Sequence, residues 1–255
     1  MKTKLYWAVS VLVIMVIVFS VMVAAMTIPA SDRAKENAKA PEKSTAITTN
    51  NGVWELEKIV FIHYAKPTKP PKPPNGDVCY KLLGVKWKSL PVNYVINPTN
   101  SDGLTEDFVT SAISTSAETW DDAISNELFK DTYTISYTAQ YGVLDSNNTI
   151  VFGDYSDVNV IAVTTIWYTR KGRQIVEFDI LFDTDFTWGD ATENSSVMDL
   201  QNIATHELGH GVGLGDIYTS SCSEVTMYGY STEGETEKRT LEQPDILGLQ
   251  KMYGT

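Results

Sequence analysis

The segment from His206 to Asp216 (HELGHGVGLGD) constrains the fold of this chain more than any other part of the sequence. Its two histidines are four positions apart, which on a helix places both imidazoles on one face, about 6 Å apart along the axis. That spacing suits two nitrogen ligands of one metal ion. Glu207 is rotated by about 100° around the helix, so it can reach a water beside the ion as a general base.

Two histidines leave a zinc site one protein ligand short, because catalytic zinc usually has three. The remaining histidine of the chain, His63, lies far upstream, so we expect a carboxylate as the third ligand. Asp216 follows His210 by six positions, with three glycines between them. Glycine permits positive φ and close backbone approach, so the helix can end there and the chain can turn back. We therefore predict that His206, His210 and Asp216 bind one Zn²⁺.

This segment resembles the long zinc signature of metzincins, His-Glu-x-x-His-x-x-Gly-x-x-His/Asp. The matching residues are His206, Glu207, His210, Gly213 and Asp216. The aspartate at the last position is similar to the variant found in snapalysin-like and some prokaryotic matrixin-like enzymes. This resemblance implies a matrixin-like zinc metalloendopeptidase that hydrolyses peptide bonds in protein or peptide substrates. Metal-activated water would be the nucleophile, with Glu207 as general base.

The segment from Val225 to Tyr230 looks like the methionine-bearing turn that lies under the metal in this family, with Met227 as the methionine. Matrixins usually have proline where Gly229 stands. Tyr228 and Tyr230 are candidates for the wall of a substrate pocket. The resemblance covers roughly residues 85–255 and implies that substrate adds a strand along an edge formed by Val160 to Tyr168.

Hydrophobic periodicity predicts a mixed α/β (α+β) domain. By resemblance, its sheet is twisted and mostly parallel, with an antiparallel edge strand, two long helices and a small C-terminal subdomain ending in a helix. Lys171 to Arg173 predicts a hairpin turn. We expect helices over Thr105–Ile124, about Ser196–Val212 and Pro244–Tyr253, and strands over Pro91–Asn97, Thr132–Ala139, Asn148–Phe152, Val160–Arg170 and Gln174–Phe182.

The N-terminus holds an uncharged apolar run from Leu5 to Met26, preceded by two lysines. The run is long enough to span a bilayer, and the lysines before it favour export of the downstream chain. We expect residues 1–30 to be a membrane anchor or, alternatively, a signal cleaved after Ala30. Residues 31–76 are expected to form a Pro/Lys-rich stalk or short prosegment, within which Trp54–Tyr64 favours a strand, and residues 77–255 an extracytoplasmic domain.

The net charge of the chain is −12, and the negative charge is concentrated in residues 77–255. An acidic domain repels nucleic acid, so we exclude that partner. Cys79 and Cys222 lie in no Cys-x-x-Cys pair, and export would make a disulfide between them the default. A loop bearing Asp183, Asp185 and Asp190 is a candidate for Ca²⁺.

Three alternatives remain open on the sequence alone. The domain could be a catalytically inactive adhesion or binding module on the cell surface. It could use His206 and His210 only for metal-dependent stability. It could also belong to another zinc protease class in which a distant carboxylate, Glu224 or Glu233, replaces Asp216 as the third ligand.

Overall fold

The computed structural model describes residues 42–49, 52–66 and 78–255. The apolar run from Leu5 to Met26 and the proline-rich stretch from Pro67 to Pro74 lie outside the described residues. Within the described ranges, no helix combines the length and the apolar character needed to cross a bilayer. The expected N-terminal anchor or signal therefore stays a prediction.

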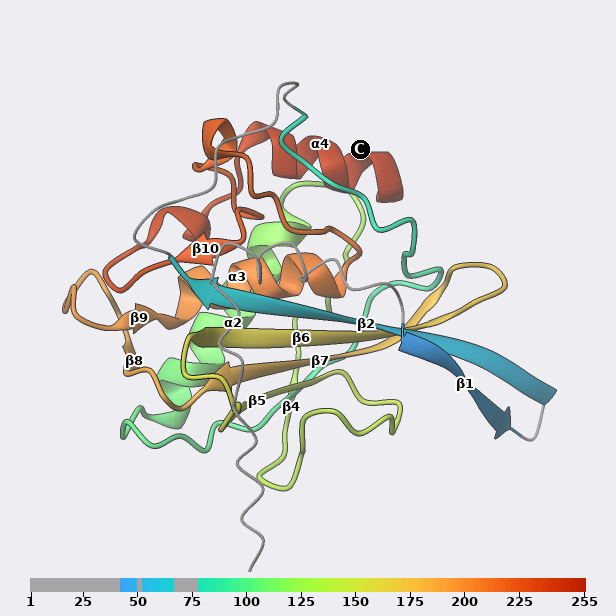
Figure 1. The fold of residues 1–255 in the computed structure, drawn as a ribbon, viewed down its shortest axis with the longest axis horizontal. Coiled ribbons are helices and arrows are strands. Elements are labelled where there is room, and N and C mark those ends of the chain that lie inside the picture. Colours follow the sequence, from blue (N-terminus) through green and yellow to red (C-terminus); the bar gives the residue numbers. More distant parts are fainter. Residues whose placement is uncertain (1–41, 50–51, 67–77) are drawn as a thin grey trace, which may run out of the picture.

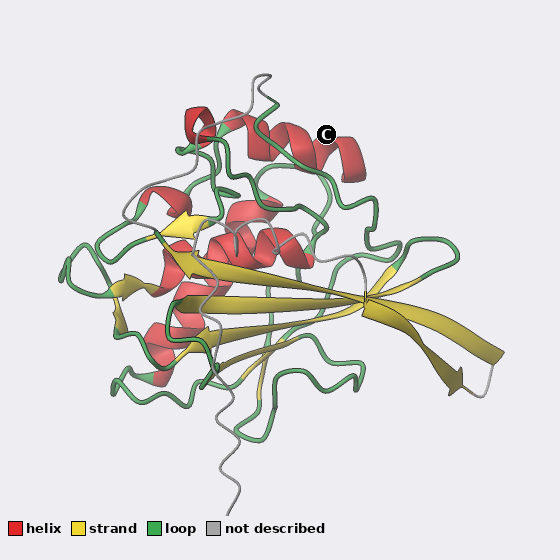
Figure 2. Ribbon diagram, viewed as in Figure 1, coloured by secondary structure: helices red, strands yellow, loops and turns green. Residues whose placement is uncertain are grey.

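A twisted sheet forms the centre of the molecule, in the strand order β1-β2-β6-β7-β5-β3-β4, with β10 paired to β2 (Figures 1 and 2). A second, two-stranded sheet pairs β8 with β9. The strands are β1 (Glu42–Thr49), β2 (Gly52–Ala65), β3 (Val95–Ile96), β4 (Thr134–Ile135), β5 (Thr149–Gly153), β6 (Val160–Thr169), β7 (Ile175–Asp183), β8 (Trp188–Gly189), β9 (Met198–Asp199) and β10 (Tyr230–Ser231).

The sheet has a parallel part and an antiparallel part. The strands β7, β5, β3 and β4 are parallel, whereas β6 runs antiparallel to β7 through the expected hairpin turn. The mixed α/β architecture with an antiparallel strand beside a mostly parallel sheet is thereby confirmed.

The expectation that β6 forms a free edge is wrong in this conformation. Strand β2 pairs antiparallel with β6 from Leu56, opposite Thr169, to Tyr64, opposite Val160. The residues of β2 include a run of β-branched and aromatic side chains, which favours a strand at this position. The strand expected over Trp54–Tyr64 is therefore present, and it belongs to the central sheet.

The α-helices in the described residues are α2 (Glu106–Asp121), α3 (Leu200–Gly211) and α4 (Gln243–Tyr253). Helix α3 packs against β6, β7 and α2, whereas α4 lies farther from the sheet (Figure 1). Thr105 caps α2 as expected, since its Oγ1 accepts the N–H of Phe108 at 3.2 Å. Helix α4 has proline in its first turn and ends at Gly254, whose φ is 93°. Two short 3₁₀ turns, Ser220–Cys222 and Glu237–Arg239, lie between α3 and α4.

Several elements are shorter than expected because side chains end them. Helix α2 stops at Asp121, whose carboxylate accepts the N–H groups of Leu128 and Phe129 and turns the chain. Helix α3 begins at Leu200 because Asp199 is its N-cap and accepts the N–H of Asn202 at 2.8 Å. Strands β3 and β4 are reduced to two residues each within the ranges Pro91–Asn97 and Thr132–Ala139.

Helix α3 is held from both sides. Trp120 of α2 donates its indole N–H to the carbonyl of Thr205 at 2.8 Å, and Ser116 donates to the carbonyl of Gln201 at 3.0 Å. On the sheet side, Phe178 of β7 packs on the α3 backbone at Gly211. These contacts fix the helix that carries both predicted histidine ligands, so the geometry of the site follows from the packing of the core.

Candidate metal centre

The two histidines of α3 are oriented by backbone carbonyls. His206 and His210 are both buried, and their Nδ1 atoms lie 2.7 Å from the carbonyl oxygen of Thr226 and 2.9 Å from that of Leu214. A carbonyl only accepts, so each Nδ1 carries the proton and each Nε2 keeps a free lone pair. This is how proteins usually set the tautomer of a metal-binding histidine.

The glycine-rich segment after α3 brings Asp216 back to the helix. Gly213 has a φ of 105°, and a Cβ atom there would lie 2.4 Å from the carbonyl oxygen of Val85, so the tight turn requires glycine. Beyond this turn, Asp216 Oδ1 lies 3.2 Å from His206 Nε2 and 3.3 Å from His210 Nε2. The structure thus brings all three predicted ligands together.

Buried donor atoms at this point have no hydrogen-bond partner. His206 Nε2 and Asp216 Oδ1 are both unsatisfied, although buried polar atoms normally find partners. One ligand atom from each of His206, His210 and Asp216 lies within 4.8 Å of the other two. Two imidazole nitrogens and one carboxylate oxygen are the donor set that catalytic zinc accepts, and unpaired lone pairs that converge fit such an ion.

The environment favours a neutral imidazole at His206, a protonated imidazole at His210 and an ionised carboxylate at Asp216. Burial lowers the pKa of His206 to about 4, with a further contribution from nearby His63. Burial acts to raise the pKa of Asp216, but the attraction of His210 and His206 outweighs it and the pKa falls well below the usual range. Burial lowers and Asp216 raises the pKa of His210, and the carboxylate prevails.

Glu207 lies next to the three ligands but faces a different set of partners. Its Oε2 accepts the hydroxyl proton of Thr164 on β6, and its Oε1 lies 3.1 Å from His63 Nδ1. Burial raises its pKa, and the neighbouring imidazoles act in the opposite direction. A carboxylate held beside a metal position, with its affinity for a proton increased, suits proton transfer.

The geometry of the site agrees with a comparison of the sequence with known protein families. The matrixin family pattern matches residues 86–254, which is more than half of the chain. The chain belongs to the matrixin family. The resemblance carried by the His206–Asp216 segment is thereby confirmed at the level of the family.

Known matrixins match parts of this chain. Metalloendoproteinase 1 of Glycine max is 42% identical over 78 residues, which is 29% of this chain and 24% of that protein. Human matrilysin is 40% identical over 77 residues, or 30% of this chain and 27% of the relative. Karilysin of Tannerella forsythia is 27% identical over 202 residues, or 76% of this chain and 39% of the relative. This matrixin therefore spans about a quarter to two fifths of the length of these relatives.

Met227 of this matrixin lies beneath α3, as part of the hydrophobic core. A Cβ atom at Gly209 would lie 2.3 Å from Met227 Sδ and 2.6 Å from Cζ2 of Trp120, so the helix backbone touches both side chains. The turn is fixed by Asp245, which accepts the N–H of Thr226 at 2.9 Å and that of Met227 at 3.2 Å. The carbonyl of Thr226 in turn orients His206, so this turn supports one of the predicted metal ligands.

Tyr228 and Tyr230 are buried in a small second cluster, and their role as the wall of a substrate pocket stays a prediction. The cluster also contains Cys222, and Tyr64 of β2 packs against it. Cys222 is joined to Cys79 by a disulfide, with the two Cα atoms 5.5 Å apart.

His63 and Thr164 are the site residues that the sequence prediction did not include. The ring of His63 lies 4.1 Å from that of His206, and Phe61 stacks on His210 at 4.0 Å between ring centroids. The sequence signal for His63 was a histidine within an apolar, strand-forming segment of a chain with three histidines.

The alternative ligands and the calcium candidates occupy other places. Glu224 and Glu233 are exposed and belong to none of the metal-binding clusters in the described part of the chain. Asp183 and Asp185 lie with Asp154 in a separate acidic cluster. Asp190 does not join that cluster and bonds to Arg239 at 2.7 Å. Calcium binding at this loop stays a prediction.

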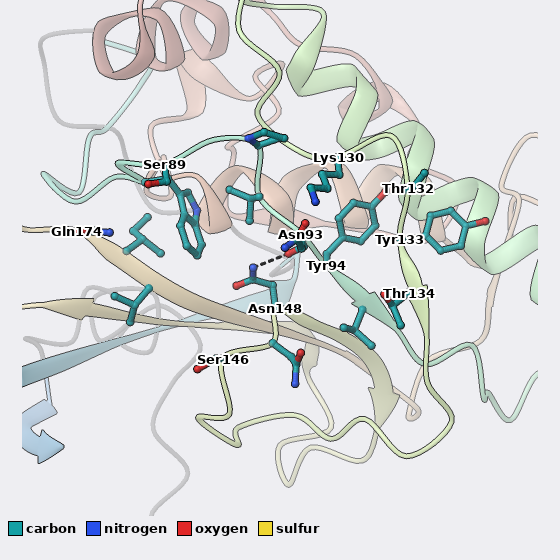
Figure 3. A pocket seen from close by; sticks show the side chains of 17 residues that line it. Ser89, Asn93, Tyr94, Lys130, Thr132, Tyr133, Thr134, Ser146, Asn148 and Gln174 are labelled. Atoms are coloured by element: carbon teal, nitrogen blue, oxygen red, sulfur yellow. Dashed lines mark hydrogen bonds between the residues drawn. The ribbon is translucent and has the colours of Figure 1, made fainter. Parts of the chain in front are cut away.

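A wide pocket of about 640 Å³ lies apart from the metal centre, beside β3 (Figure 3). Asn148 bonds there to the carbonyl of Asn93 at 2.6 Å, and Lys130 and Tyr133 lie close by. None of the described residues that line this pocket is His, Cys, Asp or Glu, the side chains that usually bind metal ions.

Proposed function

We propose that this protein is a zinc-dependent endopeptidase that hydrolyses peptide bonds in protein or peptide substrates. One observation carries the proposal: buried ligand atoms of His206, His210 and Asp216 converge beside the buried carboxylate of Glu207, and His206 Nε2 and Asp216 Oδ1 among them are unpaired. This arrangement supports a metal ligand set and a proton acceptor in adjacent positions.

The residues of the chain would divide the chemistry among them. His206, His210 and Asp216 would hold the ion, and bound zinc supplies a Lewis acid that activates water and polarises the substrate carbonyl. Glu207 would accept the proton of the attacking water and return it to the leaving amine nitrogen. The Thr164 hydroxyl, which donates to Glu207 Oε2, would keep the other carboxylate oxygen available for this transfer.

Substrate would bind as an extended strand along β6. The backbone of β6 has a full antiparallel ladder on the side away from β7, so substrate would have to take the place that β2 fills in this structure. Thr164 of β6 contacts Glu207 and links this strand to the proposed proton acceptor. Main-chain pairing would supply affinity, and side-chain pockets beside the strand would supply preference.

The variant Glu207→Gln tests the proposal. We expect peptide hydrolysis to fall by roughly 10²- to 10⁴-fold because the general base is lost, while one zinc per chain is retained. The measurement is kcat/KM on an unfolded protein or a peptide mixture, with zinc content determined on the same samples. Both are repeated in a His63→Ala background, because His63 contacts Glu207.

Glu177→Gln is the matched control, since Glu177 is also a buried glutamate but accepts backbone N–H groups instead. Its hydrolysis is expected to stay near that of the parent chain. Equal activity of Glu207→Gln and the parent would contradict the proposal. Absence of hydrolysis in every variant, with zinc bound, would favour the inactive binding module.

We also propose that the domain acts outside the cytoplasm. The disulfide between Cys79 and Cys222 and the apolar run before residue 30 support export, as a membrane-anchored or a secreted protein. Cell fractionation followed by alkaline carbonate extraction separates the two forms, because an anchored chain stays with the membrane pellet.

A further inference from the structure

Two segments of the described chain match the acceptor pattern for N-linked glycans, Asn-x-Ser/Thr with any residue but proline in the middle. They are Asn147-Asn148-Thr149, which enters β5, and Asn194-Ser195-Ser196, which lies between β8 and β9. The transferase must reach both the asparagine amide and the hydroxyl residue two positions on, so an acceptor belongs on the surface. The structure distinguishes the two segments on this point, although their sequence patterns are equivalent.

The segment at Asn194 is open over its whole length. Asn194, Ser195 and Ser196 are all exposed, within a run of exposed residues from Thr192 to Ser196. The amide nitrogen of Asn194, Nδ2, donates no hydrogen bond to any described residue. Both groups that a transferase recognises are therefore accessible in the folded chain.

The loop that presents Asn194 is held at its base by backbone bonds. The N–H of Asn194 donates to the carbonyl of Asp190 at 3.0 Å, and the N–H of Val197 donates to the carbonyl of Asn194 at 3.3 Å. The side-chain Oδ1 of Asn194 accepts the N–H of Ser196 at 3.1 Å. This local turn uses the oxygen of the amide and leaves its nitrogen available. The fold thus sets the conformation in which the acceptor is presented.

The segment at Asn147 is open at one end only. Asn147 is exposed, but Thr149 is 2% exposed and lies within β5, paired with Val95 on one side and Asp179 on the other. The N–H of Thr149 also donates to Asp179 Oδ1 at 3.1 Å. A transferase cannot reach this threonine without separating β5 from the sheet, so the folded chain offers no complete acceptor here.

We propose that Asn194 is an N-glycan acceptor site of the folded protein and that Asn147 accepts a glycan only before β5 joins the sheet. The co-substrate is an oligosaccharide linked through phosphate to a membrane lipid. Nδ2 of Asn194 gives up one proton and forms a bond to C1 of the first sugar. The bond from C1 to the phosphate oxygen breaks, and the lipid phosphate leaves with the electron pair. The inference rests on the export proposed above and is independent of the zinc site.

Cell-free transfer to the purified, disulfide-bonded full chain tests the assignment. The probe is a lipid-linked oligosaccharide with a purified oligosaccharyltransferase that requires only Asn-x-Ser/Thr, and the readout is intact mass with glycopeptide mapping. We expect one glycan per chain, at Asn194. Asn194→Gln and Ser196→Ala should lose it, because each removes one of the two recognised groups. Ser195→Ala is the matched control and should retain it, since the middle position tolerates any residue except proline.

The same reaction on the reduced, alkylated and unfolded chain separates burial from sequence. There we expect glycans at both Asn147 and Asn194, and Asn147→Gln should remove one of them. Modification of Asn147 in the folded parent as readily as Asn194 would overturn the role assigned to β5. A folded parent left unmodified at Asn194, while a short acceptor peptide is modified in the same mixture, would overturn the site.

Failure of this proposal and failure of the proposed export give different results. The full chain is expressed in a eukaryotic cell, and the chain from the medium, the membranes and the cytoplasm is mapped for glycopeptides. An exported chain without a glycan at Asn194 overturns the acceptor site. A chain that stays in the cytoplasm but accepts the glycan in the cell-free reaction overturns export and supports the acceptor site.

Discussion

Two groups of buried carboxylates in this protein differ in what they face. Asp179 and Asp245 accept backbone N–H groups: Asp179 bonds to Gly142 at 2.8 Å and Thr149 at 3.1 Å, and Asp245 bonds to the turn around Met227. Asp216 instead faces two imidazole nitrogens, and its Oδ1 has no hydrogen-bond partner. The first group connects loops to the core, and the second offers lone pairs to a cation.

The difference also appears in the pKa values. Burial raises the pKa of Glu177 and of Asp179 to about 7, although backbone N–H groups act to lower both. Burial acts on Asp216 in the same direction, yet the attraction of the imidazoles brings its pKa below the usual range. Burial alone therefore does not identify a functional acid, because the partner of the carboxylate decides the sign of the shift.

The largest effect expected from this comparison is on metal affinity. Asp216→Ala removes a ligand and should raise the zinc dissociation constant by roughly 100-fold or more, above the loss typical of outer-shell partners. Asp179→Ala removes an equally buried carboxylate that faces only backbone N–H groups and should leave zinc affinity unchanged. Competition with a chromophoric chelator measures both. Zinc retained at full affinity by Asp216→Ala would indicate another ligand, such as Glu224 or Glu233.

A smaller effect is expected at Asp245, which bonds the Met227 turn and through that turn connects to His206. Asp245→Asn keeps one acceptor oxygen but leaves one N–H donor of the Met227 turn, that of Thr226 or of Met227, facing an amide NH2, and should lower the free energy of unfolding by about 1–3 kcal/mol. The same turn orients His206 through the carbonyl of Thr226, so zinc affinity should fall by roughly tenfold.

Urea unfolding of the zinc-free chain and a zinc titration measure the two effects of Asp245→Asn separately. Asp107→Asn, an exposed change in the first turn of α2, is the control and should shift stability by about 0.5 kcal/mol at most. A destabilised Asp245→Asn chain that binds zinc with unchanged affinity would break the proposed connection between turn and ligand.

The smallest expected effect is on the pH dependence of the stability of the fold. The folded-state pKa values of Glu177 and Asp179, about 7, lie above their ordinary values, so their protonated forms favour the folded state. Their contribution to stability is full below about pH 4 and is lost as the pH rises through 7. In zinc-free protein, the double variant Glu177→Gln, Asp179→Asn should show a flatter melting temperature between pH 5 and 8 than the parent. An unchanged slope would assign that pH dependence to other groups.

The cluster of His206, His210 and Asp216 could be predicted from the sequence because its members lie within eleven consecutive residues. Helical spacing relates His206 to His210, and the turn glycine explains how Asp216 returns, so local geometry suffices. The existence of the main helices and of β5, β6 and β7 follows from periodicity for the same reason. The exact ends of α2 and α3 depend on Asp121 and Asp199, whose bonds to neighbouring N–H groups leave no periodic signal.

The contact between His63 and Glu207 could not be predicted in this way, because it joins residues 144 positions apart. Composition identified a strand near Trp54–Tyr64, but strand pairing is a tertiary property that no local pattern specifies. The resemblance placed a free edge at β6 since it describes the matched domain alone. The upstream segment that covers this edge lies outside the matched residues.

The close contact of Gly209 with Met227 and Trp120 has a consequence for which ion the site retains. A helix pressed against two large side chains cannot slide along its axis, so the imidazoles of His206 and His210 keep a fixed separation. The segment that returns to Asp216 is buried and hydrogen-bonded as well, through Leu214 to Gly209 and through Gly215 to Lys81. Discrimination between divalent cations would thus depend on the length of this turn, and lengthening it would change metal preference while the helix stays the same.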